Sequence, residues 1–76
     1  MKTKEGYLIF VKEFYPKRTT PIVYVKSNSS KRMLGEIKWY SPWRQFAFFP
    51  YQGTIWNRDC LSEINNKISE LMEERG

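Results

Sequence analysis

The side chains that could carry out chemistry in this chain are few. Cys60 is the only thiol among the 76 residues, and the chain contains no histidine. A cysteine nucleophile needs a general base and an oxyanion donor beside it, and the sequence offers no histidine for the first role. Free cysteines are among the most buried residue types in proteins. We therefore interpret Cys60 as a structural residue.

The carboxylates and glycines do not form a recognisable catalytic or binding pattern either. Three of the eight acidic residues stand among basic residues before position 50, and the other five lie between Asp59 and Glu74. The four glycines are far apart, which excludes a glycine-rich phosphate loop. One cysteine without histidine excludes a Cys/His zinc site within one chain. We expect a protein that is not an enzyme, with no cofactor and no metal.

The basic side chains suggest a binding surface. Residues 1–50 hold ten of the 13 Lys and Arg residues and three acidic residues, a net charge of +7, whereas residues 51–76 have a net charge of −2. Phosphate contacts need such charges on one surface, and single-strand binding adds rings on which bases stack. Five rings are candidates for stacking: Tyr7, Tyr24, Tyr40, Trp43 and Phe46. The same charges would equally serve to keep a sheet soluble.

A short segment from Tyr40 to Arg44 is the sharpest feature of the sequence. Trp, Tyr and Arg are the residue types that dominate the energetics of protein interfaces. The predicted partner-binding residues are this segment and nearby basic side chains: Tyr40, Trp43, Arg44, Lys38, Arg32 and Lys31. An aromatic cluster that only stabilises the turn would fit Tyr40, Trp43 and Arg44 equally well. Trp39 and Phe48 are expected in the core.

Four segments with alternating or β-branched residues must position these side chains. The predicted strands are Gly6–Phe14, Pro21–Lys26, Met33–Tyr40 and Trp43–Phe49, joined by turns at Pro16, at residues 27–32 and at Ser41-Pro42. In the third strand, alternation places Ile37 and Trp39 on one face and Leu34, Glu36, Lys38 and Tyr40 on the other. Gly35 within this strand indicates a bulge or a close backbone approach.

The last segment has the pattern of an amphipathic helix over about residues 58–74. Asn57 is suited to cap its first turn, where Asp59 also complements the helix dipole. The apolar residues recur at helical spacing: Leu61, Ile64, Ile68, Leu71 and Met72. We therefore predict one α+β domain over residues 1–76, with a small antiparallel sheet of about four strands at about residues 6–50 packed on the C-terminal helix, in the order β-β-β-β-α.

The second half of the chain resembles a known group of proteins. The segments Leu34–Pro50, with its LGEIKWY and WRQFAFFP runs, and Thr54–Ile64 are similar to a signature of small proteins from bacteriophages, prophages and other mobile elements. This group has no settled activity. The resemblance implies a viral or mobile-element source and assigns no functional residue.

These features predict a non-enzymatic binding protein that inhibits a host factor or a defence system through an exposed aromatic and basic sheet surface. The alternative is a nucleic-acid-binding accessory protein that uses the same face. A homodimer through the open sheet face or a sheet edge would also hide surplus rings. No stretch approaches the roughly 20 apolar residues of a membrane span, so we expect no membrane contact and a location in the host cytoplasm.

Overall fold

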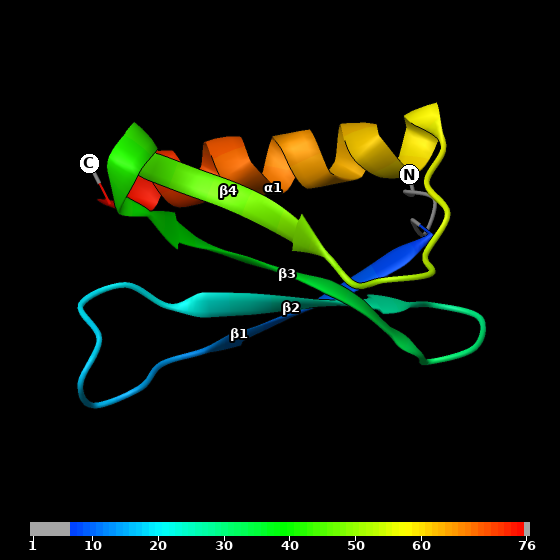
Figure 1. Cartoon of the computed structure of the whole chain (residues 1–76), viewed down its shortest axis with the longest axis horizontal. Coiled ribbons are helices and arrows are strands. Elements are labelled where there is room, and N and C mark those ends of the chain that lie inside the picture. Colours follow the sequence, from blue (N-terminus) through cyan, green and yellow to red (C-terminus); the bar gives the residue numbers. More distant parts are fainter. Residues whose placement is uncertain (1–6, 76) are drawn as a thin grey trace.

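The computed structural model describes residues 7–75 of the chain, and they form a sheet and one long helix (Figure 1). The elements in chain order are β1 (Leu8–Glu13), β2 (Ile22–Ser27), β3 (Met33–Tyr40), a 3₁₀ turn (Ser41–Trp43), β4 (Gln45–Pro50) and α1 (Arg58–Arg75). The strands are antiparallel neighbours in the order β1-β2-β3-β4, and α1 packs on one face of the sheet. The predicted α+β fold is confirmed. Gly6, the expected start of the first strand, lies outside the described residues.

The core lies between α1 and the strand side chains that face it. Successive side chains of a strand point to opposite faces, so every second residue meets the helix. The buried core residues are Leu8, Val23, Val25, Ile37, Phe46, Ile64 and Leu71. Trp39 and Phe48 pack at the margin of this core, as the sequence predicts. The Trp39 ring meets the edge of Phe46 at a centroid distance of 5.4 Å.

Gly35 is a point of close packing between β3 and β4. A Cβ atom at this position would lie 2.8 Å from Cε1 of Phe48 and 2.9 Å from the carbonyl oxygen of Phe49. The register between β2 and β3 also shifts after Val25, the partner of Gly35. Both features predicted for this glycine, a bulge and a close backbone approach, are present.

Because of the bulge, Leu34 lies on the other face of β3 from the one that was predicted. Simple alternation groups Leu34 with Glu36 on the outer face of β3, but Leu34 packs against the core. Gly35 and Met33 are the β3 partners of consecutive β2 residues, so Leu34 is the extra residue of the bulge. An extra residue interrupts the period of two, and a residue before the bulge no longer follows the alternation that holds after it.

The connection from β3 to β4 differs from the sequence prediction. The fourth strand was expected over Trp43–Phe49, but Trp43 belongs to the 3₁₀ turn and Arg44 has a left-handed backbone with φ of 56°. The Arg44 N–H donates to the carbonyl oxygen of Tyr40 at 3.0 Å. Pro42 favours the start of a helical turn, which delays the strand until Gln45. Arg44 therefore does not share a strand face with Phe46, contrary to the prediction.

The helix begins as the sequence predicts. The Cys60 N–H donates to Oδ1 of Asn57 at 2.8 Å, which confirms Asn57 as the cap. Leu61 belongs to the predicted apolar stripe but not to the buried core, because it is 48% exposed. At 100° per residue, Leu61 lies about 60° around the helix from Ile64, on a flank of the buried line. Within residues 7–75, no helix is long and apolar enough to cross a membrane.

Candidate functional site

The face of the sheet opposite α1 is the main candidate surface (Figure 1). The pairing register and the alternation along each strand identify the residues that share it. The exposed residues Glu13, Met33 and Gln45 lie at the ends of the strands on this open face. Its half-buried residues are Ile9, Val11, Ile22, Tyr24, Lys26, Glu36, Lys38, Tyr40, Ala47 and Phe49. Seven of these ten are aromatic or aliphatic, so the face is a mainly apolar surface with a few charges.

Three rings and a lysine form a connected group that extends along the open face from the turn between β3 and β4 to Phe49, the residue before the last of β4. We call Lys38, Tyr40, Trp43 and Phe49 the turn cluster. The Tyr40 ring meets Trp43 at a centroid distance of 4.9 Å and Phe49 at 6.0 Å, both edge to face. The Lys38 ammonium lies 4.9 Å from the centroid of Phe49. Trp43 remains 65% exposed, so its ring is available to a partner.

The charges of the open face nearly balance. Nζ of Lys38 lies 3.0 Å from Oε2 of Glu36, and the Tyr51 hydroxyl donates to Oε1 of the same carboxylate at 3.2 Å. Burial and the negative charge of Glu36 raise the pKa of Tyr51 above its usual value. Lys26 is the other cation of this face. The open face is therefore more aromatic than basic.

A tyrosine pair extends the open face at its other margin. The hydroxyls of Tyr15 and Tyr24 are 2.7 Å apart and share a hydrogen bond, and this bond raises the pKa of Tyr15. Tyrosines with an apolar ring and a polar tip are common at protein interfaces. The two tyrosines thus continue the aromatic surface from β2 onto the loop that follows β1.

Two predicted site residues, Lys31 and Arg32, lie at the opposite end of the sheet from Trp43. They belong to the loop between β2 and β3, whereas Trp43 and Arg44 belong to the loop between β3 and β4. These loops leave opposite ends of β3, which spans about 25 Å at 3.3 Å per residue. The six predicted residues therefore do not form one site. Tyr40, Trp43 and Lys38 are close together, with Arg44 next in the chain.

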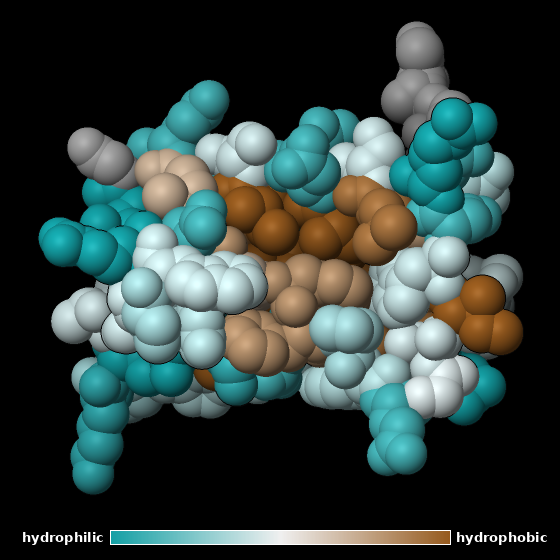
Figure 2. Space-filling model, turned by 45° about the horizontal axis from the view of Figure 1, so that its top comes forward, coloured by the Kyte–Doolittle hydropathy of each residue, from teal (hydrophilic) through white to brown (hydrophobic). Residues whose placement is uncertain are grey.

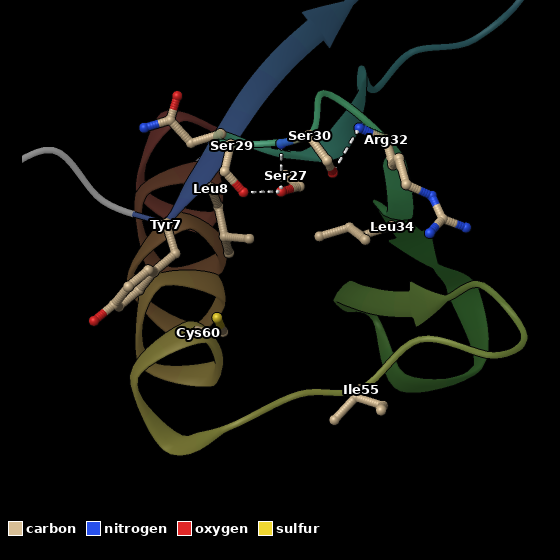
Figure 3. A pocket seen from close by; sticks show the side chains of 10 residues that line it. Tyr7, Leu8, Ser27, Ser29, Ser30, Arg32, Leu34, Ile55 and Cys60 are labelled. Atoms are coloured by element: carbon tan, nitrogen blue, oxygen red, sulfur yellow. Dashed lines mark hydrogen bonds between the residues drawn. The ribbon is translucent and has the colours of Figure 1, made fainter.

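A depression of about 480 Å³ lies beside the loop between β2 and β3 (Figure 3). Leu8, Leu34 and Cys60 point into it from β1, β3 and α1, and the serines of the loop form its rim. Arg32 lines the depression, whereas Nζ of Lys31 donates to the Asn28 carbonyl oxygen at 2.8 Å. The side chain of Lys31 therefore binds the backbone of its own loop.

The other candidate side chains have simpler positions. Phe46, expected as a base-stacking ring, is 3% exposed and belongs to the core, so it cannot stack on a base. Tyr7 is exposed beside the depression. Cys60 is half-buried next to the core. Within residues 7–75, no three Cys, Asp or Glu side chains are placed to hold a metal ion.

Sequence reasoning missed the tyrosine pair and Phe49 as members of the surface. Tyr24 was a candidate stacking ring, but Tyr15 was predicted only as part of the turn at Pro16, and Phe49 only as part of the fourth strand. Phe49 lies beside Glu36 only because β4 pairs with β3. Tyr15 reaches Tyr24 only because β1 and β2 form a hairpin. A sequence signal exists for Phe49, because alternation places it on the opposite face of the strand from Phe46 and Phe48.

Comparison with known proteins places the chain among phage proteins. No protein-family model matches it, and no solved structure matches it. The chain is 36% identical over 69 residues to an uncharacterised 9.3 kDa protein of Acholeplasma phage L2, and the match covers 91% of this chain and 88% of the relative. This result supports the resemblance to small phage proteins. The chain therefore belongs to the family of small phage proteins that includes this 9.3 kDa protein.

Proposed function

We propose that this protein is a non-enzymatic binding module that docks on a protein of the host cell, as an inhibitor of a host factor or of a defence system. The observation that carries the proposal is the turn cluster, in which the exposed Trp43 stands beside an aromatic sheet face. Exposed aromatic residues clustered in this way are typical of the energetic centre of a protein interface. The membership in a phage family supports a host target in the host cytoplasm.

The charge of the open face favours a protein partner over a nucleic acid. Protein interfaces are depleted of charge at their centre and enriched in aromatic residues. The pairing of Lys38 with Glu36 leaves the open face close to this composition. A phosphate-binding surface would instead present several cations without nearby carboxylates.

Replacement of Trp43 tests the proposal. A host extract is passed over the immobilised full chain, the retained protein is identified and purified, and its dissociation constant is measured. Trp43→Ala should weaken binding by about 10- to 100-fold, because hot-spot residues contribute about 1.4–3 kcal/mol. Glu73→Ala, an exposed change on α1, should leave the affinity unchanged. Equal affinity of Trp43→Ala and the wild type would contradict the proposal.

Nucleic-acid binding is a second candidate, supported by the net charge of +5 and by its distribution. Lys17 and Arg18 in the loop after β1 lie at the same end of the sheet as Arg44, because β1 and β3 run in the same direction (Figure 1). Binding of a labelled oligonucleotide whose log affinity falls linearly with log salt would favour this candidate. Affinity for the host protein that survives at high salt would favour the first.

A further inference from the structure

The two edges of the sheet differ in how they are protected. Natural proteins blunt exposed sheet edges with charges, bulges or proline. The edge strand β1 carries Lys12 and Glu13. The other edge strand, β4, has the sequence QFAFFP, with no charged residue, and its register with β3 is regular throughout. Pro50 protects only its last position. The β4 edge therefore lacks the charges and bulges that normally prevent pairing with another strand.

The hydrogen-bonding pattern shows which β4 groups face away from the sheet. The Tyr51 N–H donates to the carbonyl oxygen of Leu34, which makes these residues a hydrogen-bonded pair. Such pairs alternate along an antiparallel ladder, so Phe49, Ala47 and Gln45 also bond to β3. The N–H and C=O groups of Phe46 and Phe48 therefore point outward from the β4 edge. Phe48 is half-buried, whereas Phe46 is 3% exposed, so pairing at Phe46 requires the atoms that cover it to move aside.

The flank of α1 beside β4 carries no acidic residue. Glu63 and Glu74 bond to Tyr7 and Lys12, which shows that the acidic flank faces β1. At 100° per residue, all five acidic side chains of α1 lie on that flank or on the outer side. The flank toward β4 carries the apolar and neutral residues Leu61, Asn65, Ile68 and Met72, with Arg58 and Arg75 at its two ends. The Arg75 guanidinium lies 4.0 Å from the centroid of the Trp39 ring. Figure 2, with the α1 side brought forward, shows an apolar strip across the middle of the molecule between hydrophilic borders.

We propose that a second copy of this chain pairs with the β4 edge and the adjoining α1 flank. An antiparallel pair related by a twofold axis places Phe46 of each copy opposite Phe48 of the other. This register uses all four outward N–H and C=O groups of Phe46 and Phe48 in each copy, and it puts Ala47 on the axis. A shift by two residues toward Pro50 would use one group fewer, because proline has no N–H.

Pairing of two copies accounts for both the uncharged β4 edge and the adjoining α1 flank without acidic residues. A twofold interface joins the same patch of both subunits, so an uncharged edge meets an uncharged edge without repulsion between two chains of net charge +5. The two α1 helices would lie antiparallel on the same side of an eight-stranded sheet. Leu61 of one copy would then approach Met72 of the other. This side shares Ala47 and Phe49 with the open face, but the pairing does not rest on the proposed host partner.

The mass of the full chain in solution tests the pairing. Light scattering on the purified protein at about 100 µM should give twice the chain mass of 9.2 kDa. Ala47→Glu should give the single-chain mass at the same concentration. Within one chain, the new carboxylate lies opposite Lys38, the residue of β3 that pairs with position 47. Opposite charges on paired residues stabilise a sheet, so the variant should fold. In the pair, two carboxylates would meet at the axis, where the Cα atoms of a non-hydrogen-bonded pair are about 4.5 Å apart.

Ile9→Glu is the matched control. Ile9 is a half-buried residue of the open face on the other edge strand, and its partner across β2 is Lys26. This variant should keep the doubled mass, and circular dichroism should show both variants folded. Leu61→Glu, a change of an exposed residue on α1, should also weaken the pair at least tenfold. A wild-type chain with the single mass, or an Ala47→Glu chain with the doubled mass, would overturn the proposal.

Discussion

At the scale of single residues, packing around Gly35 shows how little room the sheet leaves. A Cβ atom there would approach a ring atom of Phe48 and a backbone oxygen of Phe49 closer than 3.0 Å. Gly35→Ala should lower the free energy of unfolding by about 1–3 kcal/mol, because overpacking forces the neighbours to shift. In thermal unfolding, each kcal/mol corresponds to a fall in the melting temperature of about 4–8 °C for a domain of this size.

Gly53 provides the comparison for this prediction. It has a positive φ of 84°, but no atom lies within 4 Å of the Cβ position. Asparagine tolerates this backbone conformation better than other non-glycine residues. Gly53→Asn should therefore unfold at nearly the wild-type temperature. If Gly35→Ala were as stable as Gly53→Asn, the close approach of β4 to Gly35 would be refuted.

At the scale of elements, the start of α1 depends on one polar side chain. The first N–H groups of a helix have no partner within it, and Asn57 accepts one of them, from Cys60. Asn57→Ala should cost about 1 kcal/mol of stability in urea unfolding. Asn57→Asp should keep the wild-type value, since a carboxylate also caps and complements the helix dipole. A loss as large for Asn57→Asp would contradict a capping role.

At the scale of the whole molecule, an ion pair joins the first strand to the end of the helix. Nζ of Lys12 lies 2.6 Å from Oε1 of Glu74, and the hydrogen bond from Lys12 lowers the pKa of Glu74 below its usual 4.5. A carboxylate that is more acidic when folded stabilises the fold above its unfolded pKa and loses that contribution on acidification. The pair therefore stabilises the protein at neutral pH and not in acid.

Urea unfolding at two pH values tests this link. The difference in unfolding free energy between the wild type and Glu74→Gln should be largest near neutral pH and should vanish as the pH falls through the pKa of folded Glu74. The neighbouring exposed Glu73 carries the same charge on the same helix, so Glu73→Gln is the control for net charge. The same pH dependence in both variants would mean that Lys12 does not stabilise the fold through Glu74.

The periodicities and the capping residue allowed much of the architecture to be predicted. Strand β3 was placed at its observed bounds, and the helix start at Asn57 was correct, because alternation, helical spacing and capping are local properties of the chain. The core positions of Trp39 and Phe48 were predicted from the tendency of such large apolar side chains to be buried, and the structure confirms them. The assignment of Leu34 failed because a bulge depends on how two strands pair, and pairing is not a local property.

The candidate site divides in the same way. The sequence alone determined which residue types are available. It places aromatic and basic residues around Trp43, and it contains no histidine and one cysteine. Only the tertiary structure decided that Lys31 and Arg32 lie far from Trp43 and that Phe49 joins Tyr40. It also decided that β4 is an edge with a helix flank beside it that carries no acidic residue. Strand order and helix placement bring distant segments together, and their energies depend on contacts that no local pattern specifies.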